Sequence, residues 1–269
     1  MRRKLIIALS GLTLSVSLAV VTLSQGQEQA PAKPAPRHPD GRPNLGPLPG
    51  ETGMWQPGGS RLADVDHFDP KDPKAAFNRP DGFPGKLKLS EVPFQPWAYD
   101  VWKTHRDALS KDDPEARCLP PGVPRMSTTP YPWTIVQTPK LIVIVYEGGA
   151  HIWRKIFMDG RAHDPNVEDT WLGDSIGHWE GDTLVVDTVG QTDKSWIDEA
   201  GIPHSSSMRV IEKISRPDLA HLTIEHIIED PKTFTKPWTF TTHPTLLKGE
   251  LIEYICQENN RDVEHLFGK

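Results

Sequence analysis

The stretch WLGDSIGHWEGDTLVVDTVG, residues 171–190, decides the fold because it joins two strand-like runs across a tight turn. Gly181 and Asp182 supply the turn signal, and the run after them, TLVVDTV, is dominated by the β-branched residues that favour strands. Asp187 stands in the middle of this second run, where a strand that packs on a core ordinarily carries an apolar residue. The pattern predicts a β-hairpin and raises the question of what this carboxylate faces.

Short strand-like runs separated by turn residues continue on both sides of the hairpin. The runs are TIVQT (134–138), LIVIVYE (141–147), HIWRKIFM (151–158), WLGDSIGHW (171–179), TLVVDTV (183–189), MRVIEKIS (208–215), HLTIEHII (221–228), WTFTT (238–242) and LIEYICQ (251–257). No helical pattern recurs between them, which argues against a βαβ fold. Closure into a barrel removes the exposed edges of such a meander. We therefore predict an all-β fold, an antiparallel up-and-down β-barrel of roughly eight or nine strands. A flattened sandwich is the alternative.

The start of the chain has the layout of a secretory signal peptide. Residues 1–26 combine a basic beginning, an apolar run and small residues. An uncleaved anchor is the alternative, but no basic stop-transfer cluster follows. No later segment is long and apolar enough to span a bilayer, so we expect no stable membrane insertion after cleavage. We expect the protein in the periplasm or secreted.

Outside the cytoplasm, the two cysteines are expected to form a disulfide between Cys118 and Cys256. In the chain-entropy model, closing so long a loop stabilises the fold by about 4–5 kcal/mol. The bond would tie the proline-rich half of the chain to the last predicted strand.

Composition divides the rest of the chain. Residues 27–50 are rich in Pro, Gly and charge and are typical of a linker or an extended arm. Residues 51–133 are irregular, except for a helix expected near 94–109, which begins with a proline and packs on the barrel. Residues 134–269 form the barrel domain, with a polar tail at the end.

Several charged residues occur among apolar neighbours within the predicted strands, for example Arg154, Glu212 and His226. A charge that points into a barrel costs several kcal/mol unless it is paired. These residues therefore either face solvent or join a satisfied polar network inside. The alternation alone does not say which face of each strand points inward.

The candidate catalytic residues are those suited to proton transfer near neutral pH. They are His151, His163, His204, Asp174 and Asp187. The candidate ligand-binding residues would hold an anionic group or line a pocket. They are Arg154, Arg161, Tyr146, Glu147, Trp171 and Trp179.

The sequence lacks the common motifs for metals, nucleotide cofactors and serine hydrolases. No HExxH, CxxC or HxH spacing is present, so only dispersed residues could hold a metal, and we predict none. Glycine-rich nucleotide loops are also missing, and we predict no cofactor. The sequence GDSIG resembles a serine hydrolase elbow, but Ser175 is expected within a strand. The net charge of -6 and the lack of a basic cluster argue against a nucleic-acid partner.

The chain resembles a large group of uncharacterised secreted bacterial proteins. The matching stretches include HPDGRPNLGP, EARCLPPGVPRM, TPYPWTIVQTP, YEGGAHIWRKIFMDGRAHDP, TWLGDSIGHWEGDTLVVDTVG, IPHSSSMRVIEK, EDPKTFTKPWT and EYICQENNRDVEH. The WLGDSIGHWEGDTLVVDT block is the most specific of them. The resemblance implies a shared fold and a shared pocket that includes the candidate histidines and aspartates, but no reaction. The predicted barrel also looks like the calycin type, which includes the lipocalins, and such a likeness concerns the fold alone.

Three hypotheses follow for function. The first is a protein that binds a small apolar or aromatic molecule in the barrel cavity, between tryptophans. The second is a cofactor-independent lyase, isomerase or hydrolase that uses the histidines and aspartates as acid and base. The third is a structural envelope protein, which predicts a barrel filled by side chains. In the first two, the partner is a small-molecule ligand or substrate.

Overall fold

The structure of the protein is a computed structural model. It describes residues 33–57, 63–64, 87–88, 91–108 and 111–258. The predicted signal peptide lies outside these residues. No helix in the described ranges is both long enough and apolar enough to cross a bilayer.

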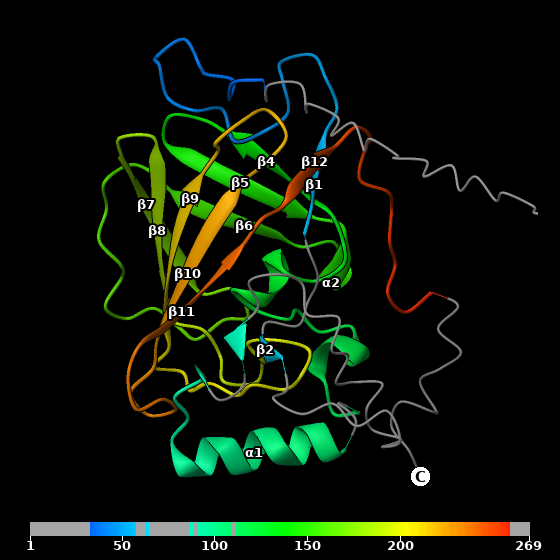
Figure 1. The fold of residues 1–269 in the computed structure, drawn as a ribbon, viewed down its shortest axis with the longest axis vertical. Coiled ribbons are helices and arrows are strands. Elements are labelled where there is room, and N and C mark those ends of the chain that lie inside the picture. Colours follow the sequence, from blue (N-terminus) through cyan, green and yellow to red (C-terminus); the bar gives the residue numbers. More distant parts are fainter. Residues whose placement is uncertain (1–32, 58–62, 65–86, 89–90, 109–110, 259–269) are drawn as a thin grey trace, which may run out of the picture. The chain divides into compact units, whose positions relative to one another are not determined.

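The described elements are mostly strands (Figure 1). The strands are β1 (Met54–Gln56), β2 (Ala63–Asp64), β3 (Leu87–Lys88), β4 (Trp133–Gln137), β5 (Leu141–Tyr146), β6 (Trp153–Phe157), β7 (Asp174–Glu180), β8 (Thr183–Val189), β9 (Arg209–Ser215), β10 (Thr223–Glu229), β11 (Trp238–Thr242) and β12 (Thr245–Leu247). The helices are α1 (Pro96–Asp107), the short 3-10 helices η3 (Pro114–Arg117) and η4 (Arg125–Ser127), and α2 (Gly148–His151). The prediction of an all-β fold is confirmed, and the helix predicted near 94–109 is present as α1, over Pro96–Asp107.

One ten-stranded sheet holds most of these strands, in the order β11-β10-β9-β8-β7-β6-β5-β4-β1-β12. Neighbours pair antiparallel except β6 and β7, which run parallel and have Phe157 opposite Ile176. Residues 158–173 link them as an irregular crossover, which parallel neighbours require in place of a tight turn. The prediction of a wholly antiparallel up-and-down sheet is therefore wrong at this junction, and the sheet is mixed.

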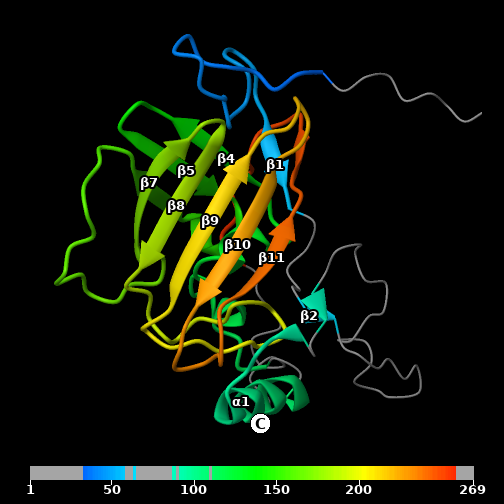
Figure 2. The same ribbon diagram turned by 60° about the vertical axis from the view of Figure 1, so that its left-hand side comes forward.

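The sheet curls into a half-barrel (Figures 1 and 2). The strands at the two ends of its order, β11 and β12, follow each other in the chain and are separated by His243 and Pro244. Beside this bend, Leu222 N donates to Pro244 O (3.0 Å) and Leu246 N donates to Ala220 O (2.7 Å). One continuous stretch of chain thus pairs with β10 and then with β1, which brings the two edges of the sheet together at one end.

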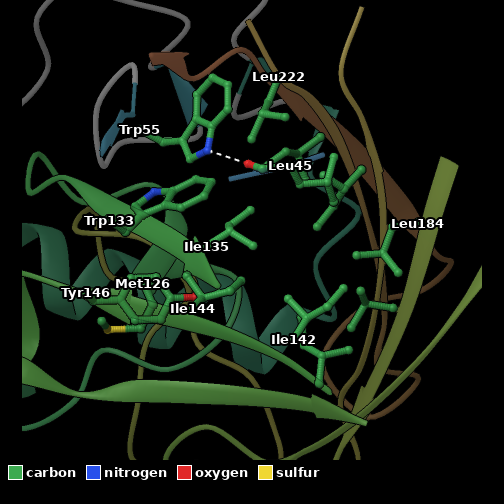
Figure 3. Packing of buried hydrophobic residues seen from close by; sticks show 14 residues of the cluster. Leu45, Trp55, Met126, Trp133, Ile135, Ile142, Ile144, Tyr146, Leu184 and Leu222 are labelled. Carbon is green, nitrogen blue, oxygen red and sulfur yellow. Dashed lines mark hydrogen bonds between the residues drawn. The ribbon is translucent and has the colours of Figure 1, made fainter. Parts of the chain in front are cut away.

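Side chains fill the space inside the curve of the sheet (Figure 3). In β5, β9 and β10, every second residue is buried, as expected of strands with one face on a core. The largest members of this cluster are Trp55, Trp133 and Tyr146, each at most 1% exposed. Trp55 also donates from its indole nitrogen to Leu45 O (2.9 Å), so the described part of the proline-rich arm packs on the same core.

A second apolar cluster lies at the end of the sheet beside α1. Trp102 of α1 packs there with Phe234, Trp238 and Phe240, the last two from β11. His105 of the same helix stacks on Trp196 (ring centroids 4.3 Å apart). The helix thus covers the loops that lead out of the sheet.

Two of the predicted strands differ in the structure. The run that begins at Trp171 becomes a strand only at Asp174, because Gly173 turns the chain with a φ of +66°. A Cβ at Gly173 would lie 2.4 Å from Val189 O, so a side chain does not fit there. LIEYICQ forms no strand, since β12 already pairs with β1 and ends at Leu247. The predicted disulfide between Cys118 and Cys256 is confirmed.

Candidate functional site

A buried polar network crosses the inside of the half-barrel. Arg154 of β6 and Glu212 of β9 form an ion pair, with Nη2 2.6 Å from Oε2, and both side chains are 1% exposed. Arg154 also donates to Ser175 Oγ (3.0 Å) and to Thr188 Oγ1 (2.7 Å). Burial raises the pKa of Glu212, but Arg154 and His226 together outweigh burial and hold that pKa below its ordinary value. Arg154, predicted to hold a ligand, is thus engaged within the core.

His226 completes this network from β10. Its Nδ1 lies 3.5 Å from Glu212 Oε1, its Nε2 lies 3.2 Å from Thr242 Oγ1, and its ring stacks on Phe240. The residue is fully buried. Burial lowers the pKa of His226 to about 4, against the opposing effect of Glu212, so the imidazole is neutral at neutral pH.

Three of the predicted catalytic residues meet on the outer face of the sheet. His163 Nδ1 lies 2.7 Å from Asp174 Oδ2, and His163 Nε2 lies 3.6 Å from Asp187 Oδ2. Arg209 of β9 binds Asp187 with two donors, at 2.8 and 2.7 Å. Burial raises the pKa of Asp187, but Arg209 and His163 together outweigh burial and keep the pKa below its ordinary value. The carboxylate in the middle of TLVVDTV therefore faces outward and is paired.

His204 is placed apart from these aspartates. Its Nε2 lies 2.8 Å from Ser195 Oγ, and its Nδ1 lies 3.0 Å from Ser205 O. If Nδ1 carries the proton and donates it to that carbonyl, Nε2 accepts from Ser195, as a general base does with a nucleophile. However, Ser195 is 1% exposed and His204 is 4% exposed. Burial also lowers the pKa of His204. A substrate therefore cannot reach Ser195 or His204, and the hydrogen bond between them stabilises the fold.

This closure gives a direct prediction for Ser195. We expect no covalent adduct when the native protein is incubated with a fluorophosphonate probe, because the hydroxyl is shielded on all sides. Intact mass spectrometry of the treated protein checks this outcome. An adduct on Ser195 that disappears in a His204→Asn variant would instead establish a serine hydrolase.

Other predicted residues serve local structure. Arg161 forms a salt bridge with Asp159 (2.6 Å) and lies over the Phe157 ring. These contacts stabilise the turn that follows β6. Trp179 packs on the barrel core, whereas Trp171 precedes β7.

Tyr146 and Glu147 lie at the end of β5. Tyr146 is buried, with its hydroxyl 3.4 Å from Ser127 Oγ. Glu147 accepts a hydrogen bond from Ile252 N (2.9 Å). The side chain of His151 falls outside the part of the chain that the structure describes.

A cleft of about 530 Å³ lies beside the disulfide, outside the barrel core. The residues that line it come from irregular segments and short helices rather than from the sheet. They are Asp113, Glu115, Ala116, Cys118, Arg125, Pro130, Tyr131, Gly149, Glu199, Tyr254, Ile255, Cys256 and Glu258. Apart from the two cysteines, none of these residues was predicted, because segments without periodicity carry no signal of which side chains converge.

Arg125 organises the acidic side of the cleft. It is buried, and its guanidinium binds both oxygens of Asp113 (2.8 and 2.6 Å) and Oε2 of Glu115 (2.7 Å). The other oxygen of Glu115, Oε1, is buried and has no hydrogen-bond partner among the described residues. Burial raises the pKa of Glu115, although Arg125 opposes this shift. Glu115 therefore brings a carboxylate to the cleft that is only half satisfied.

Two tyrosines form an aromatic side of the same cleft. The rings of Tyr131 and Tyr254 are 5.1 Å apart, and the Tyr131 hydroxyl donates to the Tyr254 hydroxyl (3.4 Å). This hydrogen bond, together with burial, raises the pKa of Tyr131 well above its ordinary value. The cleft thus combines aromatic faces with carboxylates.

Comparison with known protein families, with curated proteins and with solved structures found no match for this chain. No group of three or more His, Cys, Asp or Glu side chains within the described ranges is arranged to hold a metal. The chemistry of the cleft is therefore the basis for a functional assignment.

Proposed function

We propose that this protein binds a small organic molecule outside the cytoplasm, in the cleft beside the disulfide. The observation that carries the proposal is the cleft itself, because its volume of about 530 Å³ suits a small ligand and its walls mix aromatic and polar groups. The sequence suggested the barrel interior as the place for the ligand. Core side chains occupy that interior, so we move the expected site to the cleft.

The lining favours a ligand that carries a positive charge. Asp113, Glu115, Glu199 and Glu258 bring carboxylates to the cleft, and Arg125 is the one basic residue among the described residues that line it. Tyrosine faces attract cations, above all those with little hydration, such as quaternary ammonium groups. A small organic cation would be attracted by the carboxylate of Glu115 and would stack against Tyr131 and Tyr254. Any apolar part of the ligand would contact the same rings.

The extracytoplasmic location and the wider kinship are parts of this proposal. A disulfide is typical of oxidising compartments, and it agrees with the signal-like start of the chain. A calycin-like architecture is supported by the uninterrupted antiparallel meander from β7 to β11. Membership of the secreted bacterial group rests on the sequence blocks that resemble it.

A cofactor-independent enzyme is the second candidate, and the contact between His163 and Asp174 favours it. If Nδ1 donates its proton to Asp174, Nε2 remains as the basic nitrogen, 3.6 Å from Asp187. A lyase, isomerase or hydrolase would then act on this outer face. A substrate screen that finds activity in the wild type but none in a folded His163→Asn variant would support this candidate.

Choline and its neutral carbon isostere, 3,3-dimethylbutan-1-ol, test the cleft assignment. We expect choline to bind measurably by isothermal titration calorimetry, and the isostere to bind much more weakly because it lacks the charge. Glu115→Gln should weaken choline binding by about tenfold, which corresponds to about 1.4 kcal/mol.

A matched charge change away from the cleft serves as the control. Glu180→Gln, at the exposed end of β7, should leave the affinity for choline unchanged. Equal binding of choline and its isostere would refute the cation preference. Absence of binding by both would contradict the proposed class of ligand.

A further inference from the structure

The C-terminal segment, residues 248–258, forms one wall of the cleft without belonging to the sheet. Tyr254, Ile255, Cys256 and Glu258 all line the cleft. After β12 ends at Leu247, the segment pairs with no strand in the described part of the chain. This wall therefore lacks the ladder of backbone hydrogen bonds that fixes the strands.

Two apolar side chains of the segment are largely exposed in the described structure. Ile252 and Ile255 are 65% and 49% exposed, so neither is anchored in a core. The segment is attached through Ile252 N, which donates to Glu147 Oε2, and through the contact between Tyr254 and Tyr131. Both contacts are polar and partly buried, and a single polar contact of this kind contributes little net free energy to folding.

The disulfide supplies the covalent attachment and joins the two sides of the cleft. Cys118 directly follows η3, which carries Glu115, and Cys256 lies in the C-terminal segment, 138 residues later. Both cysteines are partly exposed and both line the cleft, so a reductant can approach them from there. The bond thus holds the C-terminal segment, which carries Tyr254, beside η3, which carries Glu115.

We propose that the Cys118–Cys256 disulfide is a redox gate for the cleft: the oxidised protein holds the site together, and reduction releases the C-terminal wall. The expected effect of reduction on ligand binding rests on the proposed function. A dithiol is the reductant. One of its thiolates attacks a sulfur of the disulfide, its second thiol resolves the mixed disulfide, and the two protons of the dithiol end on Cys118 and Cys256. The dithiol leaves as a disulfide.

The first test needs no ligand. Ultraviolet titration of the tyrosines is measured in the oxidised protein, in the protein reduced with dithiothreitol, and in a Cys118→Ser/Cys256→Ser variant. We expect Tyr131 to titrate far above its ordinary range when the protein is oxidised, and near the ordinary tyrosine value of about 10 in the other two forms. Tyr131→Phe assigns the signal. Hydrogen–deuterium exchange in residues 250–258 should become fast in the same two forms.

The tryptophan fluorescence of the barrel core reports on the sheet in the same samples. We expect it to stay native, since Trp55 and Trp133 lie in the packed interior. Loss of this native signal on reduction would overturn the gate, because the bond would then support the whole fold. An unchanged tyrosine titration with unchanged exchange would overturn it as well.

A choline titration of the oxidised and the reduced protein completes the test. We expect reduction to weaken binding by at least tenfold. Equal affinity in both states would refute the gate and leave the proposed function standing. If choline binds to neither form but the tyrosine and exchange signals change on reduction, the proposed function fails and the gate stands.

Discussion

Replacement of Arg154 by methionine is expected to lower the free energy of unfolding by about 3–5 kcal/mol. The substitution keeps much of the side-chain length but removes the charge that compensates Glu212, which is 1% exposed. Glu212 would then be a buried carboxylate without its main partner, and Ser175 and Thr188 would each lose a donor. Urea denaturation followed by tryptophan fluorescence measures the loss.

The matched control is Arg209→Met on the outer face of the same sheet. Arg209 binds Asp187 as closely as Arg154 binds Glu212, but its side chain is 46% exposed. Water and salt screen such a pair, so we expect a loss of less than about 1 kcal/mol. Similar losses for the two variants would show that burial does not set the strength of the inner pair.

A double variant separates the charge from the packing. Arg154→Met combined with Glu212→Leu removes both charges, so no uncompensated carboxylate remains. We expect it to be more stable than Arg154→Met alone. The loss in the double variant is compared with the losses in Arg154→Met and in Glu212→Leu measured separately. If the loss in the double variant equals their sum, the two charges do not compensate each other.

The sequence predicts the strands well because their apolar residues alternate, and this period depends only on local spacing. It also places Arg154, Glu212 and His226 among apolar neighbours, which leaves solvent or an inner network as the alternatives. The structure shows the network. The choice between them requires the register of β6 against β7 to β10, and residues far apart in sequence give no signal of that register.

The cleft could not be predicted for a different reason. Glu115, Arg125, Tyr131 and Tyr254 come from segments with no regular period, so their convergence depends on tertiary folding alone. For LIEYICQ, a regular period is present but the predicted strand does not form. Its apolar residues alternate as in a strand, but no free sheet edge is left for it beside β1, which already pairs with β4 and β12. Only the cysteines indicated in advance that this region would pack together.

Acid is expected to destabilise the protein through His226 before most carboxylates titrate. The ordinary pKa of histidine in an unfolded chain is about 6.5, and burial lowers the pKa of His226 in the fold to about 4. Between these values the unfolded chain binds a proton that the folded protein does not. The stability contributed by the neutral imidazole is therefore complete above about pH 6.5 and is lost as the pH falls toward 4. The loss is on the order of 3 kcal/mol.

Urea unfolding at pH 7 and pH 4.5 measures this effect in the wild type, in His226→Gln and in His178→Gln. His226→Gln cannot take up the proton, so its stability should depend less on pH than that of the wild type, even if it is less stable at pH 7. His178 is largely exposed on β7, and its replacement should leave the wild-type dependence intact. Because burial also lowers the pKa of His204, some acid sensitivity should persist in His226→Gln. If His226→Gln lost as much stability as the wild type over this range, the buried imidazole would not be the group that senses acid.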